Sequence, residues 1–213
     1  MGPPLANGGD LAGPEGMSAS PAAPLVLAST SPQRRAILEQ LAIPFEILRP
    51  RYVEDDSPAL GPIELVKAHA RGKAGSVADG AGERPVLGVD TAVVLDGQMY
   101  GKPQGAGEAE EMLEALSGRT HEVISGLCLR THAWEEVQAE TTRVTFRVLT
   151  PRDIAAYVSA EEWVGRAGAY AIQGLGASLV ERIEGDYLNV VGLPGALLVR
   201  LLAERFGGAY GFG

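Results

Sequence analysis

The sequence has few cysteines and histidines and no long apolar run, which argues against a disulfide, a zinc site and a membrane helix. Its single cysteine, Cys128, excludes an intrachain disulfide. The strand-like setting of Cys128 predicts a small buried side chain rather than a nucleophile. The three histidines, His69, His121 and His132, are too few and too scattered to suggest a zinc site. No apolar run approaches the roughly 18 residues that a membrane helix needs, so we expect a soluble globular protein.

Positive charge is also scarce. The chain has 18 Lys and Arg against 27 Asp and Glu, and its formal net charge is −9. This balance argues against binding to nucleic acid or to an anionic membrane through a broad basic surface. A site for a phosphorylated ligand would therefore need a local group of Lys and Arg side chains, helped by a metal ion.

The N-terminal segment lacks the composition of a folded or exported region. Residues 1–24 are rich in Gly, Pro and Ala, with neither the basic start nor the sustained apolar core of a secretory signal. We expect this extension to be disordered, with Met17 as an alternative start, and the protein to be cytoplasmic by default. A single domain over residues 25–206 and a Gly-rich tail over residues 207–213 would follow.

The most informative segment joins an expected strand, residues 25–28, to an expected helix that ends at residue 41. Between them lie hydroxyl residues 29–31 and a proline suited to the first turn of a helix. A helix start concentrates unpaired backbone N–H groups and the positive end of the helix dipole. With Arg34 and Arg35 alongside, this turn suits a phosphate. An ordinary turn with two solvated arginines explains the same residues.

The rest of the chain predicts alternating strands and helices. Asp96-Gly97 indicates a tight hairpin, and a glycine-dense loop covers residues 165–177. Because the middle of the chain is rich in hairpins, we expect an α/β fold with a mixed sheet. The expected strands are residues 45–48, 85–95, 98–100, 121–129, 137–149 and 178–183. The expected helices are residues 62–78, 108–116 and 194–205, with one more starting at the Thr150-Pro151 cap.

A few polar residues lie where chemistry is plausible. Asp90 interrupts a buried strand, and a carboxylate there costs free energy unless it is paired, hydrogen-bonded or bound to a metal. It is a metal ligand or general base, or else a bulge or capping residue. Lys102 follows the hairpin and comes near the same strand, although an exposed loop lysine fits as well. Glu54 lies in an acidic loop, and the side chains of such loops are normally exposed to solvent. Gln173 is either a turn residue or a residue that recognises a ligand by hydrogen bonds.

Several common catalytic motifs are missing. The chain contains neither GxxxxGK[ST] nor GxGxxG, which disfavours the P-loop and Rossmann nucleotide sites. It also lacks a GxSxG elbow, and no histidine is placed to activate a serine.

Taken together, the motifs resemble the Maf family. The matching segments are residues 27–35, 88–91, 101–103, 116–121, 167–174 and 189–194, in family order and spacing. The resemblance implies a nucleoside triphosphate pyrophosphatase that cuts between the α and β phosphates and needs a divalent metal cation, Mg or Mn. It also implies an inosine-triphosphate-pyrophosphatase-like fold over residues 25–206, with a long curved mixed sheet, two lobes and a central cleft. A homodimer is a further family expectation.

The resemblance carries roles to individual residues. Ser29, Ser31 and Arg34 match the family's phosphate-binding turn, which leaves Arg35 a supporting or surface role. The family's catalytic cluster is matched by Glu54, Lys73, Asp90 and Lys102. Asp90 stands in the position of the proton acceptor, and Glu54 and Asp90 are the expected metal ligands.

Substrate choice is expected to depend on Gln33, Thr91 and Gln173. Asp90-Thr91 and the segment around Gln173 resemble the branch that acts on dTTP and UTP, whereas the 7-methyl-GTP branch carries Asp-Gln. Gln33 departs from the first branch, which usually has arginine there. We expect hydrolysis of dTTP, UTP and modified pyrimidine nucleotides, as house-cleaning of the nucleotide pool. The alternatives are a 7-methyl-GTP-type pyrophosphatase and a nucleotide-binding regulator of septum formation.

Overall fold

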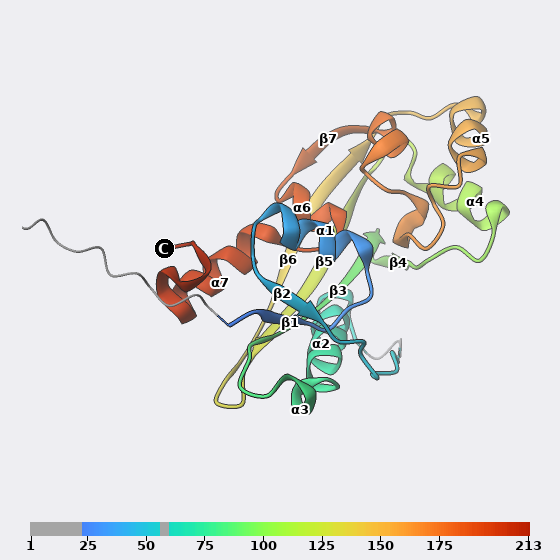
Figure 1. Ribbon diagram of the computed structural model, residues 1–213. Helices are drawn as coiled ribbons and strands as arrows, with labels where there is room; N and C mark the ends of the chain where they lie inside the picture. Colours follow the sequence, from blue (N-terminus) through green and yellow to red (C-terminus); the bar gives the residue numbers. More distant parts are fainter. Residues whose placement is uncertain (1–22, 56–59) are drawn as a thin grey trace, which may run out of the picture.

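The computed structural model describes residues 23–55 and 60–213 (Figure 1). Met17 and nearly all of the extension expected to be disordered lie outside these residues. The strands are β1 (Leu25–Leu27), β2 (Phe45–Ile47), β3 (Val86–Leu95), β4 (Gln98–Tyr100), β5 (Thr120–Arg130), β6 (Glu135–Phe146) and β7 (Val180–Glu184). The α-helices are α1 (Pro32–Gln40), α2 (Pro62–Gly75), α3 (Ala78–Ala81), α4 (Ala106–Leu116), α5 (Pro151–Ser159), α6 (Tyr187–Val191) and α7 (Gly195–Phe206). Short 3-10 helices are η1 (Ala167–Ala169), η2 (Gly174–Leu179) and η3 (Gly207–Tyr210).

The strands form one mixed sheet, as expected from the sequence. Its order is β2-β1-β3-β5-β6-β7, and β4 pairs with the outer part of β3. β1 runs parallel to β2 and to β3. The crossover through α1 allows β1 and β2 to be parallel neighbours. The other pairs are antiparallel. In Figure 1 the long strands β5 and β6 run through the centre of the molecule.

Two local signals in the sequence form the predicted turns. Asp96 and Gly97 both have positive φ, 51° and 80°, and close the hairpin from β3 to β4. Thr150 caps α5: its hydroxyl accepts from the Asp153 backbone N–H while the Asp153 carboxylate accepts from the Thr150 backbone N–H. The same carboxylate pairs with Arg147.

Some boundaries differ from the expected ones. The helix expected over residues 62–78 ends at Gly75, and α6 lies between the strand expected to end at residue 183 and the helix expected to begin at residue 194, where no helix was expected. The strand expected to reach residue 149 ends at Phe146. Val144 and Phe146 are both buried, so β6 keeps its alternation to its last residue, and the extra residue of the bulge is Glu181 on β7. Val148 lies beyond the end of the strand and is 78% exposed. The Gly-rich end packs through Tyr210, whose hydroxyl donates to the Ala23 carbonyl.

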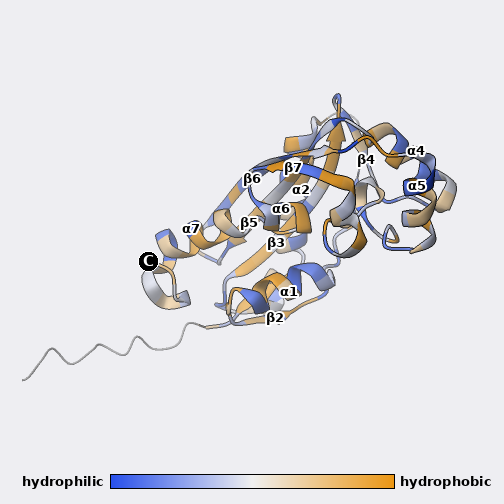
Figure 2. Ribbon diagram, turned by 90° about the horizontal axis from the view of Figure 1, so that it is seen from above, coloured by the Kyte–Doolittle hydropathy of each residue, from blue (hydrophilic) through white to orange (hydrophobic). Residues whose placement is uncertain are grey.

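The buried apolar residues divide into two large clusters along β3. Leu87 and Val89 pack with α1 and α7 in one cluster. Val93 and Leu95 pack with α4 and α5 in the other. Figure 2 shows hydrophobic and hydrophilic stretches alternating along α1 and α7, as expected of helices that cover a sheet. The two clusters are the cores of two lobes on one sheet, and the segment around Asp90 lies between them.

Helix α2 covers the opposite face of the sheet. Val66 and Ala70 from this helix are fully buried against β3 and β5. Within the described residues, no helix is long and apolar enough to span a membrane.

His121 is buried in the core beside Tyr170 and Phe146. Its ring is 1% exposed, its Nε2 lies 2.8 Å from the Tyr170 hydroxyl, and its edge meets Phe146. Its Nδ1 is buried with no hydrogen-bond partner among the described residues. Burial lowers the pKa of His121 from 6.5 to about 4.

This burial makes folding sensitive to acid. Between pH 6.5 and about 4, the unfolded chain binds a proton that folded His121 rejects, so stability falls as the pH falls, by up to about 3 kcal/mol. Denaturant unfolding at pH 7, 5.5 and 4.5 measures this slope. In the variant His121→Gln, the free energy of unfolding should fall less steeply as the pH is lowered. The same pH dependence in the two proteins would contradict the role given to His121.

Candidate active site

A cleft of about 900 Å³ opens where one edge of β3 lacks a strand partner. β5 pairs with β3 along its length. On the other edge, β1 pairs only as far as Leu87 and β4 pairs only from Val93. Among the described strands, therefore, residues 88–92 are paired on one side alone. Asp90, Thr91 and Ala92 from this stretch line the cleft.

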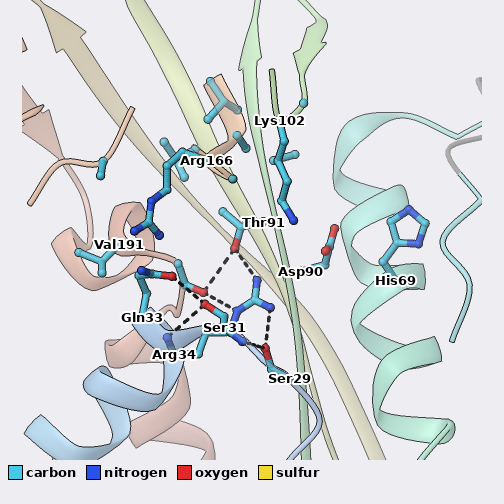
Figure 3. A pocket seen from close by; sticks show the side chains of 18 of the residues that line it. Ser29, Ser31, Gln33, Arg34, His69, Asp90, Thr91, Lys102, Arg166 and Val191 are labelled. Atoms are coloured by element: carbon cyan, nitrogen blue, oxygen red, sulfur yellow. Dashed lines mark hydrogen bonds between the residues drawn. The ribbon is translucent and has the colours of Figure 1, made fainter. Parts of the chain in front are cut away.

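Adjacent residues of β3 point to opposite faces of the sheet, which brings two helices to one site. Asp90 faces α2, where its Oδ1 lies 2.5 Å from the Lys73 Nζ. Thr91 faces α1, where its Oγ1 accepts a hydrogen bond of 3.3 Å from Arg34. Figure 3 shows Asp90 on the α2 side of the strand and Thr91 above the Arg34 guanidinium. The alternation of one strand thus joins an acidic group to a basic turn.

Lys73 holds two carboxylates on the α2 side. Its Nζ lies 2.6 Å from Glu54 Oε1 as well as 2.5 Å from Asp90, and its side chain is 12% exposed. Burial alone would raise the pKa of Glu54, but the hydrogen bond and charge of Lys73 outweigh that effect. Charges on His69 and Lys102 act in the same direction, so the pKa of Glu54 lies below its ordinary value. Glu54 is therefore ionised at neutral pH.

Two glycines let α2 lie directly on the sheet. Gly126 stands opposite Asp90 on β5, and a Cβ there would lie 2.2 Å from the Val66 carbonyl oxygen. A Cβ at Gly88 would lie 2.1 Å from the Ala70 carbonyl oxygen. Any larger residue at either position would push the helix outward. This close approach brings Lys73 within reach of the strand that carries Asp90.

The turn before α1 is organised by its own hydroxyl groups. The Ser29 hydroxyl accepts a 3.1 Å hydrogen bond from the Ser31 backbone N–H and a 3.3 Å one from Arg34. Ser31 is the N-cap of α1, where its hydroxyl accepts from the Arg34 backbone N–H at 3.5 Å and donates to Gln33 Oε1 at 3.1 Å. These bonds fix the direction of the arginine that follows.

Arg34 connects this turn to β3 and to the end of α6. Besides Ser29 and Thr91, its guanidinium donates at 2.9 Å to the carbonyl of Gly192, the residue that ends α6. Thr91 Oγ1 lies 2.9 Å from the buried Ser125 hydroxyl. Burial lowers the pKa of Arg34, while the charges of Asp90 and Glu54 oppose this shift. The guanidinium remains charged, because arginine pKa values lie far above neutrality.

The remaining predicted residues come from the opposite lobe. Lys102 follows β4 and is exposed, and Gln173 precedes η2. Both line the cleft. The Gly168 N–H donates to the Gly101 carbonyl at 3.0 Å and ties the glycine-dense segment to the loop that carries Lys102.

Every residue selected from the sequence therefore lines one cleft, although the selection draws on segments far apart in the chain. These residues are Ser29, Ser31, Gln33, Arg34, Glu54, Lys73, Asp90, Thr91, Lys102 and Gln173. Arg35 instead pairs with Glu39 at 2.9 Å on the exposed side of α1, as expected of a surface residue.

The residues that line the cleft but were not selected from the sequence include His69 and Arg166. His69 lies one turn before Lys73 on α2 and bonds through Nδ1 to the Tyr52 hydroxyl at 3.1 Å. The i, i+4 spacing from Lys73 is a signal that could have found it. Arg166 lines the wall formed by the glycine-dense segment. It follows Gly165 and is the basic residue of this segment, which is the signal that could have found it.

The cleft can contribute two carboxylates to a metal ion. Within residues 23–55 and 60–213, no cluster of three or more Asp, Glu, His or Cys is placed to hold a metal by itself. Glu54 and Asp90 both contact Lys73, so their oxygens converge on one region. Mg²⁺ is commonly bound by one or two carboxylates together with substrate phosphates. The donor set fits an ion that arrives with a phosphorylated substrate.

Comparison with known proteins places the chain in a family. The family model described as "Maf-like protein" matches residues 24–205. The chain belongs to the Maf family. All of the cleft residues selected from the sequence lie within the matched range.

Curated members of the Maf family are similar over most of this chain. A protein of Gloeobacter violaceus named dTTP/UTP pyrophosphatase is 48% identical over 180 residues, covering 84% of this chain and 95% of the relative. One of Moorella thermoacetica with the same name is 49% identical over 181 residues, covering 84% and 93%. A third, from Bacillus velezensis, is 44% identical over 180 residues, covering 84% and 95%.

The close packing of α2 gives a test of the site's construction. The substitution Gly126→Ala places a methyl group against the helix backbone and should lower the free energy of unfolding by about 1–3 kcal/mol. Gly107→Ala is the matched control, because a Cβ there meets nothing within 4 Å. Denaturant unfolding measures both. Equal stability of the two variants would contradict the role given to Gly126.

Proposed function

We propose that the protein hydrolyses nucleoside triphosphates, dTTP and UTP above all, to a nucleoside monophosphate and pyrophosphate. The observation that carries this proposal is that cationic side chains and two carboxylates, Glu54 and Asp90, meet in one cleft. The names of the relatives, dTTP/UTP pyrophosphatase at 44–49% identity, support the same reaction.

Local charge explains how an acidic protein would attract such a substrate. A triphosphate carries about four negative charges, which a net charge of −9 repels at long range. Inside the cleft, Lys73 offsets part of the charge of Glu54 and Asp90, while Arg34 is surrounded by neutral oxygens. Arg34 and Lys102 therefore present positive charge to the phosphates.

Asp90 is the residue best placed to activate water. It lies in the stretch of β3 that is paired on one side alone, its side chain is 15% exposed, and its Oδ1 lies 2.5 Å from the Lys73 Nζ. In this proposal the carboxylate orients the attacking water and accepts its proton. Lys73 positions the carboxylate, and Arg34 and Lys102 stabilise the negative charge that develops on the leaving pyrophosphate.

A divalent cation, Mg or Mn, fits this arrangement. Glu54 and Asp90 would hold it together with phosphate oxygens. When bound, the ion would neutralise phosphate charge.

Three side chains of the cleft are the candidates for reading the base and sugar. Gln33 is oriented by its bond to Ser31, and Thr91 is held between Arg34 and Ser125. Gln173 lies exposed at the opposite wall. In this proposal the site takes pyrimidine nucleotides, including modified ones, and the enzyme serves to clear the nucleotide pool.

The role of Asp90 is testable by an isosteric substitution. Asp90→Asn should lower kcat on dTTP by about 10²–10³-fold, as the loss of other preorganised polar groups does. Pyrophosphate release with saturating divalent metal measures this. Asp96→Asn, in the exposed hairpin at the end of the same strand, is the matched control and should keep wild-type turnover. Turnover of Asp90→Asn near that of the control would contradict the role.

Substrate choice needs a separate measurement. A panel of dTTP, UTP, CTP and 7-methyl-GTP should show the highest kcat/KM for dTTP and UTP, with monophosphate and pyrophosphate as products. The variant Gln33→Arg should change the ratios within the panel more than the overall rate, because Gln33 lies outside the Lys73 cluster. Preference for 7-methyl-GTP would contradict the substrate assignment, and tight binding without pyrophosphate release would indicate a nucleotide sensor.

A further inference from the structure

Arg166 lies on the wall of the cleft opposite the Ser29–Arg34 turn. It precedes η1 in the glycine-dense segment. In Figure 3 its side chain and that of Lys102 enter from the same side, and its guanidinium points toward Gln33 and Val191. None of the interactions described above gives this side chain a role.

The guanidinium of Arg166 has no ion-pair partner within residues 23–55 and 60–213. Its Nε is buried and has no hydrogen-bond partner among the described residues. No ion pair found among those residues includes Arg166. Arg130 also has a buried Nε without a partner, but its Nη1 pairs with Glu135 at 3.2 Å. A buried donor without a partner is unfavourable unless a ligand or water supplies the acceptor.

The backbone around Arg166 is held firmly in place. The Arg166 N–H donates to the Trp163 carbonyl at 3.0 Å, and Gly168 bonds to Gly101. Gly168 has a φ of +68°, and a Cβ there would lie 2.9 Å from Val93 Cγ1, so the segment packs directly on β3. Arg166 and Lys102 therefore share one rigid wall.

Two other cations of the cleft, Lys73 and Arg34, already have partners, whereas Lys102 is an exposed ammonium. Lys73 contacts Glu54 and Asp90, and Arg34 donates to Ser29, Thr91 and Gly192. Among the described residues, Arg166 is the guanidinium of the cleft whose N–H donors have no protein acceptor and are available to a ligand. A planar guanidinium matches two oxygens of one phosphate.

We propose that Arg166 is a substrate-binding residue that donates hydrogen bonds to phosphate oxygens of the nucleoside triphosphate. This inference rests on the proposed function and extends it to a residue outside the catalytic cluster of Glu54, Lys73, Asp90 and Lys102. A phosphate supplies the negative charge that the site lacks, whereas the neutral carbonyl of a base would leave the guanidinium uncompensated. Arg166 and Arg34 then hold the phosphate chain from opposite walls.

Substitutions at Arg166 separate charge from geometry. Arg166→Ala should lower kcat/KM for UTP by about 10- to 100-fold, the usual effect of losing a hydrogen bond to a charged group. CTP and dTTP should lose the same factor, because all three share the triphosphate. Arg166→Lys should recover part of the loss, while Arg166→Gln should not. Arg152→Ala, at an exposed position of α5, is the matched control and should behave like the wild type.

Inorganic pyrophosphate gives a test that involves no base. Its dissociation constant, measured by calorimetry, should rise in Arg166→Ala by about the same factor as kcat/KM falls. The thermal midpoint should stay near the wild-type value, since the side chain makes no hydrogen bond or ion pair with the described residues that would be lost.

The outcomes distinguish the inference from the proposed function. Unchanged pyrophosphate binding in Arg166→Ala overturns the inference, and a loss confined to one base shows that Arg166 reads the base instead. If the wild type turns over no triphosphate, the proposed function fails. The pyrophosphate affinities of the wild type and the variant still decide whether Arg166 binds phosphate.

Discussion

The contact of Lys73 with Asp90 is the interaction on which the site depends. A carboxylate in the middle of a strand that is otherwise buried is unfavourable unless a charged partner accompanies it. Lys73 supplies that partner and also binds Glu54. The contact requires α2 to lie against the sheet, and the absence of a side chain at Gly88 and Gly126 permits this. Fold and site are thus constrained by the same packing.

The position of the cleft follows from the way the sheet is shared between two apolar cores. β3 contributes to both cores, and its middle stretch has a strand on one edge only. Basic groups then reach this stretch from both sides: Arg34 from the first turn of α1, and Lys102 and Arg166 from the other lobe. A protein of net charge −9 can in this way build a local site for a polyanion.

Features with a local cause were predictable from the sequence. The hairpin at Asp96-Gly97, the cap at Thr150 and the exceptional Asp90 each rest on a few neighbouring residues. Features that depend on distant packing were not. The strand expected to reach residue 149 ends at Phe146, where its pairing with β7 ends. Arg166 gains its interest only because no carboxylate of the described residues pairs with it, which no local pattern shows.

The central claim is that Lys73 compensates Asp90 inside the cleft. A double-mutant cycle of Lys73→Met and Asp90→Asn, followed by denaturant unfolding, measures their coupling directly. We expect a favourable interaction of about 0.5–3 kcal/mol, with the double variant more stable than the sum of the single losses predicts. Additivity within about 0.5 kcal/mol would contradict the claim.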